Sequence, residues 1–310
     1  MIAVNTEALV KKIEEIPSLP SIVYELNRII NDPMSSTKEV ESIMSQDIGM
    51  TTKVLKLANS AYYAIPGGVT SLSRAIAFIG FDTIHQLVLS ASIISALDVK
   101  SAANFEIGDF WKHSIAVAIA SETIAKYIAH PVPADLFTGG LVHDMGKVAL
   151  YFAAPEALLQ IAEQALANNK TFYDIEVAEN VTPHTELGRM LAERWQLTKS
   201  LQAVIRFHHE GDVARRSGLS ADFNQTVDIV MLANLLIHAM KFGNSGHKTI
   251  LGAPGELLDR LHLHPQGDMP TVIKNIKMQL EQGSEFIKMI ATQDAWADRS
   301  SEANSEEKAS

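Results

Sequence analysis

The chain has 310 residues, of which 47% are hydrophobic and 20% charged, a composition that excludes a largely disordered or fibrous protein and is typical of a globular one. Its formal net charge of −10 argues against a broad electrostatic footprint for nucleic acid, so no nucleic-acid partner is expected. Because the chain contains no cysteine, disulfides, thiolate zinc sites and cysteine nucleophiles are excluded, and any metal must be bound by His, Asp, Glu or Asn.

The sequence favours a cytoplasmic protein that does not enter a membrane. The first residues lack a basic region followed by an apolar core, so they do not predict a secretory signal. The longest apolar stretches, around 87–97 and 229–237, are about half the length needed to cross a bilayer.

The hydrophobic pattern is helical throughout. Apolar residues recur at spacings of three and four after Pro20, Ser36 opens a capping box with Glu39, and Asp47 is placed to cap the next helix. No segment shows sustained alternation of period two, so we predict an all-α fold. Further helices are predicted at roughly 82–98, 109–129, 133–142, 156–167, 184–194, 199–208, 222–241 and 270–291.

Two lobes that share one core are expected, with a boundary at the polar insertion 98–104. Residues 1–98 would form an N-terminal helical lobe, and 99–242 a second lobe. Residues 243–291 would form an irregular segment followed by a helix. The Ser-, Ala- and Glu-rich residues 292–310 predict a disordered tail.

Histidines and one carboxylate mark a candidate metal site. His143 and Asp144 are adjacent, and at a helix end they can reach neighbouring metal positions, with the carboxylate able to bridge two cations. Upstream, Asp109 and His113 share a helix face at i, i+4. Downstream are His184, at a helix start, and the pair His208 and His209. Each of these histidines taken singly is usually a hydrogen-bonded core residue, but the full set favours a metal centre.

Imidazole and carboxylate ligands hold divalent first-row ions without thiolates. Iron is the expected cofactor, with manganese, nickel and zinc as alternatives, and either one or two ions fit the ligand number. If two ions share Asp144, each could polarise a water molecule or a phosphoryl oxygen, as in hydrolysis of a phosphate ester. Asp144 and Lys147 are the candidate catalytic residues, because Lys147 could face the substrate anion.

These motifs resemble the HD superfamily of metal-dependent phosphohydrolases, and within it the HDOD family, a signalling-associated output domain. The resemblance covers roughly residues 10–242, and the usual Pro after Asp47 is replaced by Ile48. It implies a helical HD-type core in 99–242 preceded by an N-terminal helical lobe. The motifs that carry it in the N-terminal half are Leu19-Pro20, Gln46-Asp47-Ile48-Gly49-Met50, Leu55 to Tyr63, Ser71 to Ile76, and Ile79-Gly80.

The resemblance implies a first metal position formed by His113, His143 and Asp144 and closed by an aspartate on a late helix. Asn234 stands where that aspartate is expected, and Asn is a neutral, weaker ligand. Asp228 is turned about 120° from Asn234 on the helix, so it is expected to face elsewhere. We therefore interpret Asn234 as a weak or indirect partner of the metal.

The second metal position would use Asp144 as a bridge, with His184 and one or both of His208 and His209. This arrangement is similar to that of the HD-GYP cyclic dinucleotide phosphodiesterases and myo-inositol oxygenase, although the Gly-Tyr-Pro signature is absent. The remaining histidines, at 85, 130, 238, 247, 262 and 264, are placed outside the site.

Three functions follow as alternatives. The first is a regulatory protein in signal transduction that keeps a metal centre and binds a signalling protein in trans or a small phosphorylated ligand. The second is a metal-dependent phosphohydrolase, with cyclic dinucleotides among its candidate substrates, and the third a di-iron oxygenase-like enzyme. The segment Asn59–Tyr63 predicts a helix end with two tyrosines packed at a lobe junction, and its alternative is a partner-docking surface.

Overall fold

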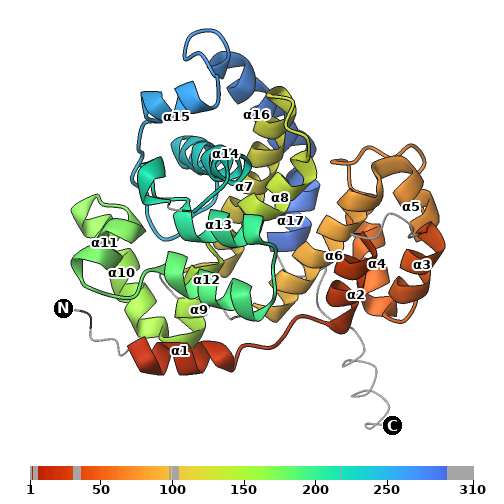
Figure 1. Cartoon of the computed structure of the whole chain (residues 1–310), viewed down its shortest axis with the longest axis horizontal. Helices are drawn as coiled ribbons and strands as arrows, with labels where there is room; N and C mark the ends of the chain where they lie inside the picture. The colour runs from red at the N-terminus through yellow and green to blue at the C-terminus, as the bar shows by residue number, and fades with distance from the viewer. Residues whose placement is uncertain are drawn as a thin grey trace, which may run out of the picture.

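A computed structural model describes residues 2, 6–30, 36–97, 99, 105–216 and 218–291, and the fold within them is all-α, with no strand. The predicted tail 292–310 and most of the predicted boundary insertion lie outside the described residues. The helices, shown in Figure 1, are α1 (Thr6–Glu14), α2 (Ser21–Ile30), α3 (Thr37–Met44), α4 (Ile48–Ala58), α5 (Leu72–Ile79), α6 (Phe81–Ala96), α7 (Ile107–Tyr127), α8 (Pro133–Val142), α9 (Met145–Ala153), α10 (Pro155–Asn168), α11 (Phe172–Ala178), α12 (His184–Arg194), α13 (Lys199–Phe207), η1 (Val213–Arg215), α14 (Ala221–Ala239), α15 (Gly255–Arg260), α16 (Met269–Gln282) and α17 (Ser284–Ala291).

The N-terminal lobe contains α2 to α6, which gather at one side of the molecule (Figure 1). Its helix starts are those that the sequence predicts. The Ser36 capping box forms in full, and the Asp47 carboxylate accepts a hydrogen bond from the Met50 amide at 2.8 Å. Ile48 is the first residue of α4, a position where no amide donor is needed, and it tolerates either proline or isoleucine.

Helix α7 is the centre of the larger lobe, and α8, α14, α16 and α17 all pack against it. Its residues are buried on every side, including Trp111, which explains its weak amphipathic pattern. Gly140 allows α8 to lie directly against α7, because a Cβ at this position would be 2.6 Å from the Ala118 Cα. Close contact of these two backbones brings the end of α8 next to the middle of α7.

Helix α1 packs with the larger lobe, although the sequence analysis placed it within the N-terminal one. Its buried residues Leu9 and Ile13 face α9 and α12. The side chain of Arg194 donates to the carbonyls of Ile13 and Ile16, at 3.0 and 2.6 Å, and the Lys12 ammonium donates to the Ala153 carbonyl at 2.7 Å. The first helix therefore crosses beneath the larger lobe before the chain enters α2 (Figure 1).

Aromatic side chains join the two lobes. Tyr62 stacks on Phe286 of α17 with ring centroids 5.5 Å apart, and Tyr63 meets the same ring edge-on at 6.1 Å. The Tyr62 hydroxyl donates to Glu122 of α7. The predicted tyrosine pair thus lies at the lobe junction, and the C-terminal helix completes that junction.

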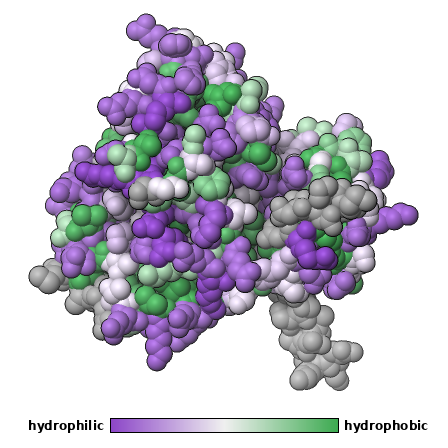
Figure 2. All heavy atoms as spheres, in the orientation of Figure 1, coloured by the Kyte–Doolittle hydropathy of each residue, from purple (hydrophilic) through white to green (hydrophobic). Residues whose placement is uncertain are grey.

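The exposed surface is mixed in character. On the face seen in Figure 2, hydrophilic and hydrophobic residues alternate in small patches. No single described helix has the length and apolar character needed to cross a membrane. Only α5 and α6, which meet at an angle of 116°, reach that threshold when they are taken together.

Candidate metal centre

The candidate ligands lie at helix ends around the middle of α7. His113 belongs to α7, His143 ends α8, Asp144 precedes α9, His184 begins α12 and His208 ends α13. All five side chains are buried, with exposed fractions of 0–1%. Gly146 permits this convergence, because a Cβ there would lie 1.8 Å from the His184 carbonyl oxygen.

Their donor atoms form two groups that share one carboxylate. In the first, one atom each from His113, His143 and Asp144 lies within 4.8 Å of the others, and in the second the same holds for Asp144, His184, His208 and His209. The structure therefore brings together every histidine that the sequence analysis placed in the site. Asp144 lies between the two groups, where the carboxylate was expected to bridge.

Three of the imidazoles are oriented through the nitrogen that faces away from the centre. The His143 Nδ1 donates to the Gly140 carbonyl at 2.7 Å, and the His208 Nδ1 donates to the Ile205 carbonyl at 3.0 Å. The His184 Nδ1 donates to the buried Glu176 carboxylate at 2.7 Å. Each Nε2 is left with a lone pair, which is the arrangement that outer partners of metal-bound histidines impose.

These lone pairs face an ionised carboxylate. The Nε2 atoms of His184 and His208 lie 3.1 and 3.4 Å from Asp144 Oδ1, and the Nε2 of His143 lies 3.3 Å from Oδ2. Asp144 Oδ1 and His143 Nε2 are buried without a hydrogen-bond partner of good geometry. Buried acceptors that face one another are costly unless a cation lies between them, so the residues fit a divalent metal.

The protonation states also fit a metal. Burial raises the pKa of Asp144, but the Lys147 ammonium and His143 outweigh it, and the pKa lies well below its ordinary value. Burial lowers the pKa of His208 to about 4 and that of His113 to about 3, so both imidazoles are neutral at pH 7. For His184, burial lowers the pKa, but the Glu176 carboxylate and the hydrogen bonds to Asp144 and Glu176 outweigh it and raise the pKa. A proton on that Nε2 would take the place that a cation fills.

Asn234 lies at the position predicted for the missing aspartate. Its Oδ1 is 3.0 Å from His113 Nε2, inside the buried cluster. Asp228 faces away, as the helix geometry predicts, and forms ion pairs with Arg216 at 2.8 Å and Arg260 at 2.6 Å. The first group therefore has a neutral amide where the sequence resemblance implied a second carboxylate.

Lys147 is bound to the carboxylate that the two groups share. Its Nζ lies 2.7 Å from Asp144 Oδ2 and 3.3 Å from the Ser245 hydroxyl, and it lies 5.1 Å above the Phe172 ring. The side chain is 1% exposed. A cation in the centre would thus share Asp144 with a buried ammonium.

Asp109 is the one residue of the predicted constellation that the structure leaves outside. Its carboxylate pairs with Lys112 at 2.8 Å on the surface, and about half of its side chain is exposed. Only its carbonyl approaches the site, where it accepts a hydrogen bond from the Asn244 amide at 3.0 Å.

His238 and His247, which the sequence analysis left outside the site, lie directly beside it. The rings of His113 and His238 are 4.4 Å apart, and His238 stacks on His247 at 4.2 Å. The spacing of four residues between Asn234 and His238 on one helix is a signal that could have identified His238. His247 and Glu176 had no such signal, because one lies in a loop and the other in a helix that the sequence pattern did not reveal.

One cavity borders the centre and a second lies beyond it. One of about 40 Å³ lies between the cluster and the loop after α14, and its walls include His208, His209 and Asn234. This volume has room for a few water molecules. The second, of about 440 Å³, lies farther out. Its lining residues are His238, Lys241, Gly243, Asn244, His247, Lys248 and Ile250.

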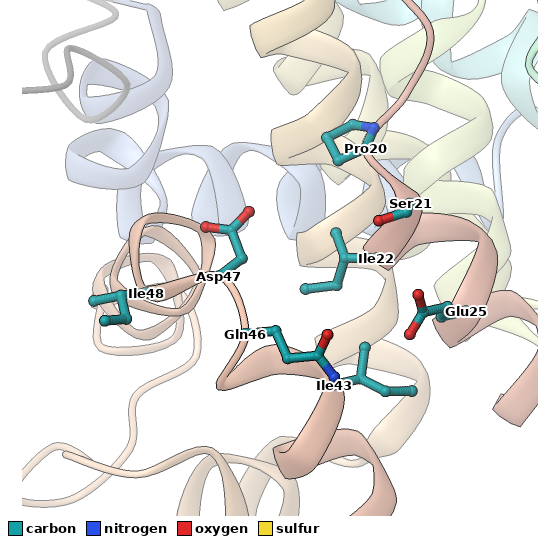
Figure 3. A pocket seen from close by; sticks show the side chains of 8 residues that line it. All are labelled: Pro20, Ser21, Ile22, Glu25, Ile43, Gln46, Asp47 and Ile48. Atoms are coloured by element: carbon teal, nitrogen blue, oxygen red, sulfur yellow. The ribbon is translucent and has the colours of Figure 1, made fainter.

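A separate pocket of about 400 Å³ lies in the N-terminal lobe, between the start of α2 and the corner joining α3 to α4 (Figure 3). Glu25 and Asp47 contribute carboxylates to it, and Ile48 is 79% exposed at its rim. Among the described residues that line this pocket there is no imidazole or ammonium, so they do not provide the donor set of the metal centre.

Comparison with known proteins agrees with this architecture. The family model for the HDOD domain matches residues 16–211. A curated relative, an uncharacterized protein of Treponema pallidum (strain Nichols), is 25% identical over 275 residues, which are 88% of this chain and 51% of the relative. The chain thus spans about half the length of the curated relative that it matches.

Solved structures share the fold. An HDOD domain protein with unknown function from Geobacter sulfurreducens has a TM-score of 0.70 at 23% identity, covering 94% of this chain and 99% of its own. A protein named "putative phosphohydrolase" from Shewanella amazonensis SB2B has a TM-score of 0.69 at 23% identity, covering 91% and 98%. A "putative signal transduction protein" from Marinobacter aquaeolei VT8 has a TM-score of 0.71 at 17% identity, covering 92% and 64%. Because the family model spans well over half of the residues, the chain belongs to the HDOD family.

Proposed function

We propose that this protein is a regulatory HDOD protein of signal transduction whose His/Asp centre holds a divalent transition metal and organises a site for a ligand or a partner. The observation that carries the proposal is the set of inward-facing lone pairs around Asp144, because a divalent cation between them would satisfy them together. Iron is the ion of first choice for a ligand set of imidazole and carboxylate, followed by manganese, nickel and zinc.

Two features of the site favour binding over turnover. The space beside the ligands is about 40 Å³, which has room for water but not for a phosphodiester. Asn234 supplies a neutral amide at the first group, so an ion there has one negative ligand, Asp144, which Lys147 also engages. A metal held in this way would stabilise the fold and shape the neighbouring cavity.

Elemental analysis of protein purified without a chelator tests the metal. We expect one or two metal atoms per chain. His143→Gln removes a ligand from the first group and His208→Gln one from the second, and their outer partners are backbone carbonyls, so neither leaves a buried charge unpaired. Each variant should lose the ion of its own group, whereas His264→Gln, at an exposed position, should keep the full content. A metal content near zero in the unmodified protein would refute the proposal.

A phosphohydrolase is the second candidate, and the shared carboxylate favours it, because two ions bridged by Asp144 would be placed to polarise one phosphoryl oxygen. Asp144 and Lys147 would then act on the substrate, after the loop beyond α14 moves aside. The metal-loaded protein should be assayed against cyclic dinucleotides and other phosphodiesters. Turnover of about 1 per second or more would establish this candidate in place of the regulatory one.

A further inference from the structure

The loop after α14 is fixed tightly over the metal centre. Residues 243–251 form this loop, which we call the strap. Gly243, at φ +67°, lies so close to α7 that a Cβ would be 2.4 Å from the His113 amide nitrogen. Gly246, at φ +101°, lies against Phe172, where a Cβ would be 2.8 Å from the ring. Two glycines in the left-handed region thus fix the strap between α7 and α11.

The strap and the end of α14 enclose the cavity of about 440 Å³ described above. This volume is within the range of small-molecule binding sites. Its inner wall is formed by His238 and His247, the stacked pair whose other side borders the small cavity at the cluster. The cavity is therefore separated from the ligands by one layer of imidazoles.

The charge of the cavity is opposite to that of the molecule. Among the described residues, the exposed side chains of Lys241 and Lys248 line it, no carboxylate does, and neither ammonium has an ion-pair partner. The chain as a whole carries a net charge of −10. Two unpaired cations gathered at one cavity of an acidic protein create a local field for an anion.

The cavity wall also contains a buried polar atom without a partner. His247, which lines the cavity, is 6% exposed, and its Nδ1 has no hydrogen-bond partner among the described residues. Gly243, Asn244 and Ile250 complete the lining with backbone, amide and aliphatic groups. This mixture of cations, an imidazole donor and an apolar side chain matches a phosphate group attached to a small organic body.

We propose that this cavity binds a small phosphorylated ligand, with Lys241 and Lys248 on the phosphoryl group and His247 donating to it. The inference rests on the proposed regulatory function and gives it a ligand class. Because the cavity adjoins the centre through His238, a metal that orders the cluster also orders the inner wall of the ligand site. The family match ends at residue 211, so the site belongs to a segment outside the matched domain.

Calorimetric titration of the metal-loaded chain tests the site with three probes, namely inorganic phosphate, adenosine 5′-monophosphate and adenosine. Phosphate and the monophosphate should bind and adenosine should not. The double variant Lys241→Gln with Lys248→Gln should weaken binding of both anions by about tenfold or more, because it removes two charge-assisted contacts. Higher salt should weaken binding in the unmodified chain and have less effect in the variant.

The matched control is Lys274→Gln with Lys277→Gln, which removes the same charge from exposed positions of α16 and should leave the affinities unchanged. Anion binding that survives in the strap variant, or millimolar phosphate that fails to bind the unmodified chain, would overturn the proposal. Metal content is measured on each sample. If the protein as purified contains no metal but binds phosphate through the two lysines, the metal proposal is refuted and the ligand proposal stands.

Discussion

Three imidazoles of the centre, those of His143, His184 and His208, have an outward contact at Nδ1 and face Asp144 with Nε2, and the outer contact decides what the inner nitrogen can do. His143 and His208 donate outward to backbone carbonyls, whereas His184 donates to a carboxylate, Glu176, which is completely buried. A buried anion behind an imidazole makes its Nε2 more basic and a stronger ligand. Glu176 therefore controls the second group without touching a metal.

Replacement Glu176→Gln should weaken metal binding at the second group by about 10- to 100-fold, because the amide keeps the shape of the side chain but not its charge. Competition with a chelator of known affinity measures the change. Glu163→Gln, at an exposed position of α10, is the control and should bind metal as the unmodified chain does. Equal affinities in the two variants would show that His184 is not a ligand.

Replacement Asn234→Asp should strengthen metal binding at the first group by about tenfold, since it adds a negative ligand 3.0 Å from His113. The same competition experiment measures it. If the variant also gains phosphodiesterase activity, the amide is what prevents turnover in this chain. An unchanged affinity would mean that residue 234 does not reach the ion.

At the scale of elements, glycines decide how closely the helices of the site approach. Gly140 brings α8 to α7, and Gly146 brings α9 to α12. These contacts place the ends of α8, α9 and α12 around one carboxylate, beside the middle of α7. The His-Asp-x-Gly spacing in the sequence is therefore both a ligand motif and a packing motif.

Replacement Gly146→Ala should destabilise the protein by several kcal/mol and lower its metal content, because the new Cβ would overlap the His184 carbonyl. Denaturant unfolding and elemental analysis measure the two effects. Gly211→Ala places its Cβ in open space and serves as the control. Similar stability in both variants would contradict the close contact between α9 and α12.

The sequence predicts elements well where caps and periodicity coincide. Predicted helices 133–142 and 184–194 match α8 and α12, since Pro133 and the polar start at His184 mark their beginnings. The sequence does not predict helices α5, α9 and α11. Each is too short to show a clear helical period, and each follows or precedes another helix closely in the chain. The candidate ligands could be predicted from their residue types and spacing. The positions of Glu176 and His247 beside the site result from tertiary packing, which a local sequence pattern does not reveal.

For the whole molecule, buried neutral histidines couple folding to pH. Burial lowers the pKa of His85 on α6 to about 4, below its ordinary value of 6.5. The unfolded chain thus binds a proton at a pH where the folded chain does not. The contribution of His85 to stability is complete above pH 6.5 and is lost as the pH falls toward 4.

We expect the difference in unfolding free energy between the unmodified chain and His85→Gln to change by about 2 kcal/mol between pH 7 and pH 4.5, with the unmodified chain losing more. Urea unfolding of chelator-treated protein at the two pH values measures this. The other histidines titrate in both chains and cancel in the comparison. Parallel pH curves for the two chains would contradict the lowered pKa.

The family match ends at residue 211, but the residues around the metal centre and its neighbouring cavities extend beyond it. Asn234, His238 and the strap all come from later residues, and α17 carries Phe286 to the aromatic junction with Tyr62. A gene fragment cut where the recognised domain stops would encode the family's motifs and yet omit one wall of the centre and the Phe286 side of the aromatic junction between its lobes. Metal binding and stability measured on such a fragment would therefore not represent those of the whole chain.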